Sequence, residues 1–245
     1  MAARVTVQKV KRRVAALIVA AGEGRRMGSA ESKAFLPLKG IPILAHTIQP
    51  FEACSRIQRL YLVLREEDIP SWHQTILDRF PFKKTQPPVP GGSQRQDSVR
   101  LGLEAIEEDI DIVLIHDGAR PFVDPPILDR LLDTVEKTQA AVVAVPATET
   151  IKVVSPRGLV VETPAREDLW HIQTPQAFDY SLILKAHRKA VADNIVTTDD
   201  ATLVERLGIP VTVVHGSYRN IKITTPKDLV IACALLENGE TSSES

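Results

Sequence analysis

The sequence predicts an α/β fold with a mostly parallel, doubly wound sheet and an inserted β-hairpin arm. Short, unbroken apolar runs alternate with segments of helical period, which is the pattern of consecutive β-α-β units. Glycines and charged residues directly follow several of these runs, where ligands bind in such sheets. The stretch 150–163 instead alternates apolar and polar residues around a turn, which predicts an antiparallel insertion. A length of 245 residues fits one such domain, expected over 14–236.

Composition excludes several classes of protein. The formal net charge of −1 provides no global basic field for nucleic acid. No apolar run approaches the roughly 20 residues of a membrane span. Cys54 and Cys233 are too few for a disulfide framework or a metal site, which predicts a reducing, cytoplasmic location. Residues 1–13 are basic and are expected to form a flexible tail; a transit peptide, and with it a plastid location in a plant, stays open.

The first predicted element is a buried strand over 14–20, an apolar run with three β-branched members. Ala21-Gly22-Glu23-Gly24 follows, and these small residues let the backbone approach a ligand and expose its N–H groups. Arg25, Arg26 and Lys33 then add three cations, which suits a polyphosphate. The loop has neither the P-loop ending nor the G-x-G-x-x-G spacing of a dinucleotide fingerprint. It predicts a nucleoside triphosphate site of another kind, with an ordinary basic turn as the alternative.

Two further helices and a strand precede the next glycine-rich segment. Helices are expected over 41–54 and 66–80, the second interrupted by Pro70, with a strand over 60–64 and a proline-rich loop over 81–90. Ser93 is expected to cap the helix that follows Gly91-Gly92. This helix would hold Arg95 and Ser98 near its positive end, where an anion or nucleotide binds well. An ordinary capped helix with an exposed arginine explains the pattern equally well.

A buried strand over 112–115 leads directly into His116-Asp117-Gly118-Ala119-Arg120. The position after a strand predicts a role in ligand binding for this segment. Asp117 could hold Mg²⁺ or a sugar hydroxyl, and Arg120 could bind a second phosphate. A local Asp117–Arg120 ion pair that stabilises the turn is the alternative. His116 is interpreted as a packed residue, because no partner suggests a general base.

The remaining elements are a helix over 128–135, a strand over 140–145, and then the hairpin arm at about 148–168. An extended segment with a Thr-Pro turn at 169–176, a helix over 180–192, a helix capped by Thr198 or Asp199, and a strand over 211–214 follow. Lys222 lies between two isoleucines, which suggests a buried anion as its partner. The last helix is expected over 227–236, with a disordered tail at 237–245.

Five segments, taken together and in order, resemble one family. These are AAGEGRRMG with Ser32-Lys33, the GG-x-x-R-x-x-S pattern at 91–98, HDGARP at 116–121, the arm at about 148–168, and LWHIQTPQ at 169–176. They resemble the polyol-phosphate cytidylyltransferases, and among these the methylerythritol phosphate enzymes of non-mevalonate isoprenoid synthesis. The resemblance implies a Rossmann-like fold and transfer of CMP from CTP to 2-C-methyl-D-erythritol 4-phosphate. This chain departs from the family pattern at Ala34 and at Gly118. At position 118 the family more often has alanine.

The resemblance also implies roles for individual residues. Arg26 and Lys33 would be catalytic, stabilising charge on the α-phosphoryl oxygens and the pyrophosphate. Mg²⁺ would be the cofactor, held mainly by the CTP phosphates and possibly by Asp117. The nucleotide would be bound by Ala20, Ala21, Gly22, Gly24, Gly92, Arg95, Ser98 and Asp117. The polyol phosphate would be bound by Arg120, Thr150, Arg166, Thr198 and Lys222, with Thr150 and Arg166 reaching across a homodimer that exchanges arms.

Four alternatives stay open at the level of sequence. Ribitol 5-phosphate could replace methylerythritol phosphate as the acceptor, because related enzymes share the loop. A non-catalytic nucleotide sensor could keep the fold, although the basic residues Arg26 and Lys33 argue against it. A nicotinamide-dependent oxidoreductase is disfavoured by the glycine spacing. A surface hairpin on a monomer is the alternative to the arm-exchanged dimer.

Overall fold

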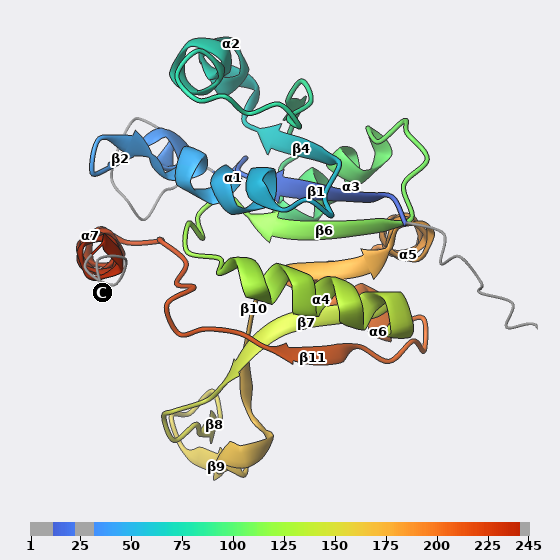
Figure 1. Ribbon diagram of the computed structural model, residues 1–245. Helices are drawn as coiled ribbons and strands as arrows, with labels where there is room; N and C mark the ends of the chain where they lie inside the picture. The colour runs from blue at the N-terminus through green and yellow to red at the C-terminus, as the bar shows by residue number, and fades with distance from the viewer. Residues whose placement is uncertain (1–11, 23–31, 241–245) are drawn as a thin grey trace, which may run out of the picture.

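The computed structural model describes residues 12–22 and 32–240, and within them one large sheet forms the centre of the molecule (Figure 1). Its strand order is β11-β7-β10-β6-β1-β4-β5. The strands are β1 (Val14–Val19), β4 (Arg59–Leu64), β5 (Val89–Pro90), β6 (Ile112–Asp117), β7 (Ala140–Pro146), β10 (Trp170–Asp179) and β11 (Thr212–His215). All neighbouring pairs are parallel except the two made by β10. The predicted mostly parallel, doubly wound sheet is confirmed.

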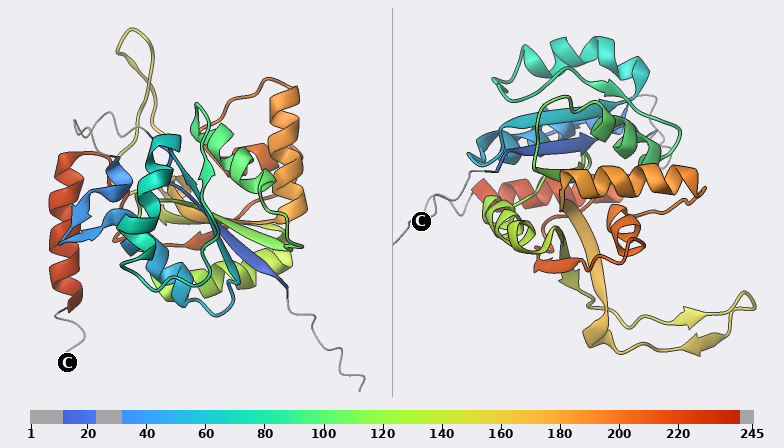
Figure 2. Two further views of the ribbon diagram at one scale, coloured as in Figure 1. Left: turned by 90° about the horizontal axis from the view of Figure 1, so that it is seen from above. Right: turned by 90° about the vertical axis from the view of Figure 1, so that its right-hand side faces the viewer.

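Helices cover both faces of this sheet (Figures 1 and 2). The alternation of β1 separates the two cores, because successive side chains of a strand point to opposite faces. Ala16 and Ile18 pack with α1 (Ile43–Ala53) and α4 (Pro125–Thr138). Ala15 and Leu17 pack with α3 (Arg95–Glu104), α5 (Tyr180–Ala192) and α6 (Asp200–Glu205). All four β1 side chains are fully buried, which explains why the strand is apolar throughout.

The segment around Gln173 differs from its prediction. An extended stretch with a turn was expected at 169–176, but β10 runs through it as a long antiparallel strand between β6 and β7. The register shifts between Ile172 and Gln176, so the turn signal corresponds to a bulge within the strand. β10 thus connects the base of the arm to the middle of the sheet.

Some helix boundaries also differ. The helix expected over 66–80 consists of a 3₁₀ turn (Glu66–Asp68), α2 (Ile69–Trp72) and a π-helical turn (His73–Leu77). The helix expected from residue 41 begins at Ile43, because Ile41–Pro42 forms β3 against β2 (Pro37–Leu38). A 3₁₀ turn, Lys33–Phe35, precedes this pair.

The two ends of the described chain are more ordered than expected. Arg13, assigned to the flexible tail, donates from its backbone N–H to Asp111 at 2.7 Å, and its side chain lies 2.5 Å from Asp109. At the other end α7 (Pro226–Glu240) continues past residue 236, so 237–240 belong to a helix and not to the disordered tail expected at 237–245. In the described part of the chain, no helix is long and apolar enough to span a bilayer.

The predicted hairpin arm is confirmed and projects away from the sheet (Figures 1 and 2). It consists of β8 (Val153–Val154) and β9 (Val160–Glu162), which pair with each other antiparallel. In the sequence the two strands lie between β7 and β10. Gly158 adopts φ +77° in the turn, a conformation that favours glycine. Leu159 and Val161 are 66% and 67% exposed, so the arm presents apolar side chains to its surroundings. A 3₁₀ turn, Arg166–Asp168, leads back into β10.

Candidate active site

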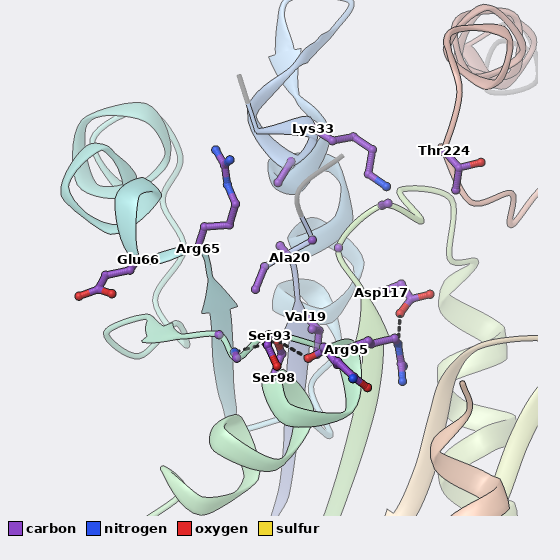
Figure 3. A pocket seen from close by; sticks show the side chains of 18 of the residues that line it. Val19, Ala20, Lys33, Arg65, Glu66, Ser93, Arg95, Ser98, Asp117 and Thr224 are labelled. Atoms are coloured by element: carbon purple, nitrogen blue, oxygen red, sulfur yellow. Dashed lines mark hydrogen bonds and ion pairs between the residues drawn. The ribbon is translucent and has the colours of Figure 1, made fainter. Parts of the chain in front are cut away.

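A cavity of about 690 Å³ opens at the carboxyl ends of β1, β4 and β6, beside the start of α3 (Figure 3). Parallel strands bring these three ends to the same edge of the sheet, and ligands bind at this edge in open α/β folds. Most of the residues predicted to bind nucleotide line it. The predicted residues in the lining are Ala20, Ala21, Gly22, Lys33, Gly92, Arg95, Ser98, Asp117 and Lys222.

The wall between β1 and α3 is built from closely packed backbone. A Cβ atom on Gly91 would lie 2.2 Å from the Cβ of Ala21 and 2.9 Å from Ser98 Oγ, so a side chain has no room there. Ser98 Oγ accepts a hydrogen bond from Gly92 N–H at 3.1 Å and lies 3.0 Å from the carbonyl oxygen of Gln94, to which it donates. These contacts hold the glycine pair against the loop that follows β1. Small residues here are therefore a packing requirement as well as an opening for a ligand.

The cap of α3 is a correction to the prediction. Gln94 is the N-cap residue, and it forms a reciprocal capping box with Asp97. Ser93, the expected cap, donates instead from its hydroxyl to Asp97 Oδ2 at 2.8 Å. Ser93 and Gln94 both line the cavity, so the capping segment also forms part of the site.

Asp117 is the electrostatic centre of the site. Its Oδ1 lies 3.0 Å from Arg95 Nε, and its Oδ2 lies 2.6 Å from Lys222 Nζ and 3.8 Å from Arg120 Nε. Burial alone would raise the pKa of this carboxyl group, but Arg95 and Lys222 outweigh burial and hold the pKa well below its usual range. Asp117 is therefore ionised at neutral pH. The buried anion predicted for Lys222 is this carboxylate.

His116 is hydrogen-bonded to the same loop. It is fully buried, and burial lowers its pKa to about 4. Thr174 Oγ1 accepts the backbone N–H of Asp117 at 3.0 Å and donates to His116 Nδ1, also at 3.0 Å. His116 Nε2 then donates to the carbonyl oxygen of Arg120 at 3.0 Å, because a carbonyl can only accept. The histidine is thus a neutral structural link, as predicted, and both of its ring nitrogens are occupied.

Lys33 and Arg65 extend toward the cavity from other elements (Figure 3). Lys33 begins the 3₁₀ turn that precedes β2. Arg65 follows β4 directly, and two of its guanidinium nitrogens each lie 2.8 Å from the carboxylate of Asp68. A third contact, 3.1 Å long, joins Arg65 to Glu67. The guanidinium of Arg65 is therefore held in place by acidic neighbours.

Several predicted residues lie elsewhere. Arg120 contacts Asp117 but is not in the lining, and it donates to the carbonyl oxygen of Asn220 at 2.8 Å. Thr150 and Arg166 are exposed near the arm, and Thr198 is exposed before α6, so a single copy of the chain does not bring these three into the cavity. The predicted residues Gly24 and Arg26 lie outside the described residues.

The sequence analysis missed part of the cavity lining, although some of the missed residues have a recognisable signal in the sequence. Arg65 directly follows the buried strand β4, and Asp117 was singled out because it comes soon after a predicted buried strand. Gly91 opens the glycine pair but was not singled out as a site residue. Thr224 left no comparable signal, because it reaches the cavity only through tertiary packing. The missed lining residues are Arg65, Glu66, Glu67, Gly91, Ser93, Gln94, Ala119 and Thr224, with Val19 and the two departures Ala34 and Gly118.

Comparisons with known proteins agree with this site. The family model described as 2-C-methyl-D-erythritol 4-phosphate cytidylyltransferase matches residues 14–238. The protein of that name from Geotalea uraniireducens is 47% identical over 228 residues, which cover 92% of this chain and 97% of the relative. The one from Halalkalibacterium halodurans is 47% identical over 224 residues, or 91% and 97% of the two chains.

Solved structures give the same family. The crystal structure of 4-diphosphocytidyl-2C-methyl-D-erythritol synthase from Anaerococcus prevotii matches with a TM-score of 0.83 and 33% identity, covering 93% of this chain and 97% of that one. The 2-C-methyl-D-erythritol 4-phosphate cytidylyltransferase from Thermus thermophilus matches with a TM-score of 0.75 and 33% identity, covering 91% and 98%. Since both fold and sequence match over almost the whole length, this chain belongs to the 2-C-methyl-D-erythritol 4-phosphate cytidylyltransferase family of nucleotidyltransferases.

Proposed function

We propose that this protein transfers CMP from CTP to 2-C-methyl-D-erythritol 4-phosphate, releasing pyrophosphate and forming 4-diphosphocytidyl-2-C-methyl-D-erythritol for isoprenoid precursor synthesis. The observation that carries the proposal is the cavity of a family member that combines close-packed small residues with four lining cations, Lys33, Arg65, Arg95 and Lys222. Ribitol 5-phosphate is the less favoured acceptor, because the matched relatives carry the methylerythritol name.

The reaction needs little proton transfer from the protein. An oxygen of the acceptor phosphate forms a bond to the α-phosphorus of CTP, and the bond from that phosphorus to the bridging oxygen breaks, so that pyrophosphate leaves with the electron pair. A phosphate monoester has a second pKa of about 6, so the attacking group is already largely dianionic at neutral pH. The protein must supply alignment and positive charge.

The small residues around the cavity would bind the nucleotide. Ala20, Ala21 and Gly22 follow β1, and the closely packed pair Gly91-Gly92 lies beside them. Without bulky side chains, a base and ribose can approach the backbone N–H and C=O groups directly. Ser98 and Asp117 would add polar contacts to this pocket. We propose the same role for Gly24.

The cations would stabilise the triphosphate and the developing charge. Among the lining residues, four cations stand against three carboxylates, Glu66, Glu67 and Asp117. We assign Lys33 and Arg26 to the α-phosphoryl oxygens and to the leaving pyrophosphate. Lys222 and Arg120, which meet at Asp117, would hold the acceptor phosphate.

We propose that Mg²⁺ accompanies the nucleotide. Both carboxylate oxygens of Asp117 are occupied, Oδ1 by Arg95 and Oδ2 by Lys222, so this residue does not fit a protein-held metal. The described residues also contain no group of three His, Cys, Asp or Glu side chains that could hold one. The ion would instead be bound by phosphate oxygens and water, as Mg²⁺ commonly is.

We further propose a homodimer in which arms are exchanged. An isolated two-stranded hairpin is at best marginally stable in water, yet this one carries exposed apolar residues along its length, including Leu159, Val160 and Val161. A second copy would cover them. Thr150 and Arg166 of that copy, together with Thr198, would then complete the acceptor site. We also propose a cytoplasmic location, which the two free thiols, Cys54 and Cys233, support.

The test is pyrophosphate release from CTP with Mg²⁺, measured with methylerythritol phosphate and with ribitol 5-phosphate, and with each component omitted in turn. We expect release that requires CTP, metal and methylerythritol phosphate together. Release only with ribitol 5-phosphate would change the acceptor and keep the mechanism. No release with either acceptor would favour a nucleotide-binding protein without this activity.

A further inference from the structure

Arg95 is shared between two buried carboxylates that come from distant parts of the fold. Its Nε lies 3.0 Å from Asp117 Oδ1 at the cavity, and its Nη1 lies 2.8 Å from Asp200 Oδ2. Asp200 is the first residue of α6 and does not line the cavity. The guanidinium of Arg95 is therefore paired at one end with a residue of the cavity, Asp117, and at the other end with a residue outside the cavity, Asp200.

Asp200 is itself held by a second buried side chain. Its own side chain is 2% exposed, and His187 Nε2 on α5 lies 3.3 Å from its Oδ1 with no exposed surface. Burial would raise the pKa of Asp200, but Arg95 and His187 outweigh burial and lower it. The carboxylate is thus charged and confined, although a buried charge is costly unless it is paired.

We infer that Asp200 is a positioning residue for CTP binding: it fixes the guanidinium of Arg95, Arg95 in turn orients Asp117 at the cavity, and His187 supports Asp200 from behind. The inference rests on the proposed function, since CTP is the ligand whose site is being aligned. Its physical basis is that a planar guanidinium with partners at both ends has one orientation, whereas one partner leaves it free to rotate.

A simple charge effect predicts the opposite result, which makes the inference testable. CTP is an anion, so removing the negative charge of Asp200 would strengthen its binding if only the total charge near the cavity mattered. If Asp200 positions Arg95, removing the charge releases the guanidinium and weakens CTP binding. The sign of the change in the Kd for CTP therefore separates the two explanations.

The experiment measures the Kd for CTP by calorimetry and turnover by pyrophosphate release in Asp200→Asn. We expect the Kd to rise roughly tenfold, within the range of couplings between contacting charged residues. Asp193→Asn is the matched control. Asp193 pairs with Lys189 on the surface at 2.9 Å, so this substitution removes the same charge without affecting a contact of Arg95. This control should bind CTP as the unmodified protein does.

A double-mutant cycle distinguishes positioning from a general loss of stability. Asp200→Asn should have almost no further effect on the Kd for CTP in an Arg95→Ala background, since the residue through which it acts is gone. An equal loss in both backgrounds, or a Kd for CTP that is unchanged or lower in the single variant, would overturn the inference.

If Asp200→Asn does not fold, His187→Gln decides the question. This variant keeps both ion pairs of Arg95 and should raise the Kd for CTP in the same direction by a smaller factor; an unchanged Kd would overturn the inference. Normal pyrophosphate release in the unmodified protein together with unaffected variants would reject only the role of Asp200. Absence of both CTP binding and release in the unmodified protein would reject the proposed function as well.

Discussion

Lys222 Nζ lies 2.6 Å from Asp117 Oδ2, and this ion pair joins the segment before α7 to the carboxyl end of β6. The Asp117 side chain is 9% exposed and the Lys222 side chain is 36% exposed, so the lysine can face a ligand while it is anchored from behind. Because its folded-state pKa is depressed, Asp117 contributes stability at neutral pH that is lost as the pH falls from the ordinary pKa of an aspartate toward the lower folded-state pKa.

Lys222→Ala should lower turnover by roughly 10²- to 10³-fold, the usual cost of removing one positive group from a site of developing charge. The variant also leaves the Asp117 carboxylate without its shortest contact. Pyrophosphate release under saturating CTP measures the effect. Lys227→Ala, at an exposed position of α7, is the control and should keep normal turnover. Near-normal turnover of Lys222→Ala would remove Lys222 from the acceptor site.

Lys33→Ala should reduce turnover by a similar factor of roughly 10² to 10³, since Lys33 lines the cavity and is assigned to the α-phosphoryl oxygens. Single-turnover kinetics would separate this loss from slow product release. Lys39→Ala serves as the comparison, because Lys39 pairs with Glu237 at 3.1 Å on the surface and does not line the cavity. The assignment fails if the two variants turn over at the same rate.

Gly91→Ala should weaken CTP binding strongly, because the added Cβ would lie 2.2 Å from the Cβ of Ala21 and one wall must move. Gly102→Ala provides the contrast: its Cβ would meet Leu17 and Val63 in the core, at 2.5 and 2.6 Å. It should lower the melting temperature with little change in the Kd for CTP. Equal Kd values in the two variants would contradict the role given to the Gly91 wall.

Stability should fall in mild acid because His116 is buried in the neutral form. Its folded-state pKa of about 4 lies below the ordinary value of 6.5, so the unfolded chain binds more protons between these values and stability is lost as the pH falls through this window. From pH 8 to pH 5 the contribution of His116 to the free energy of unfolding should decrease by about 2 kcal/mol.

Urea denaturation at several pH values would measure this loss. His116→Gln should reduce the pH dependence, whereas His73→Gln should keep it, because His73 is exposed beside Asp78. If the His116 variant shows the same decrease in the free energy of unfolding as the unmodified protein, another group is responsible.

Val161→Glu in the arm should shift the protein toward monomer and lower turnover, because a charge would replace a side chain that is 67% exposed in one subunit and that the proposed dimer buries. Analytical ultracentrifugation gives the oligomeric state. Val230→Glu is the matched control, at a 71% exposed position of α7 outside the arm. A fully active monomer would reject the contribution of Thr150 and Arg166 from a second copy.

Local patterns in the sequence were enough for much of the fold. The helix Tyr180–Ala192 was predicted with the bounds it has. In the structure Asp179 caps it by accepting from the N–H groups of Ser181 and Leu182, and such a cap depends only on neighbouring residues. The buried runs of β1 and β6 were predicted over 14–20 and 112–115, and the strands are Val14–Val19 and Ile112–Asp117. The sequence thus placed Ala20 and Asp117 close to strand ends, although it ended β6 two residues too early. The need of Lys222 for an anionic partner followed from its two apolar neighbours.

Tertiary structure decided which distant groups meet. The antiparallel direction of β10 depends on its pairing with β6 and β7, and a strand pattern is the same in either direction. The sequence by itself therefore determined most of the elements and several of the residues near their ends. Only the folded chain brought Arg95 between Asp117 and Asp200, because an ion pair requires atoms a few ångströms apart and no local pattern records that distance.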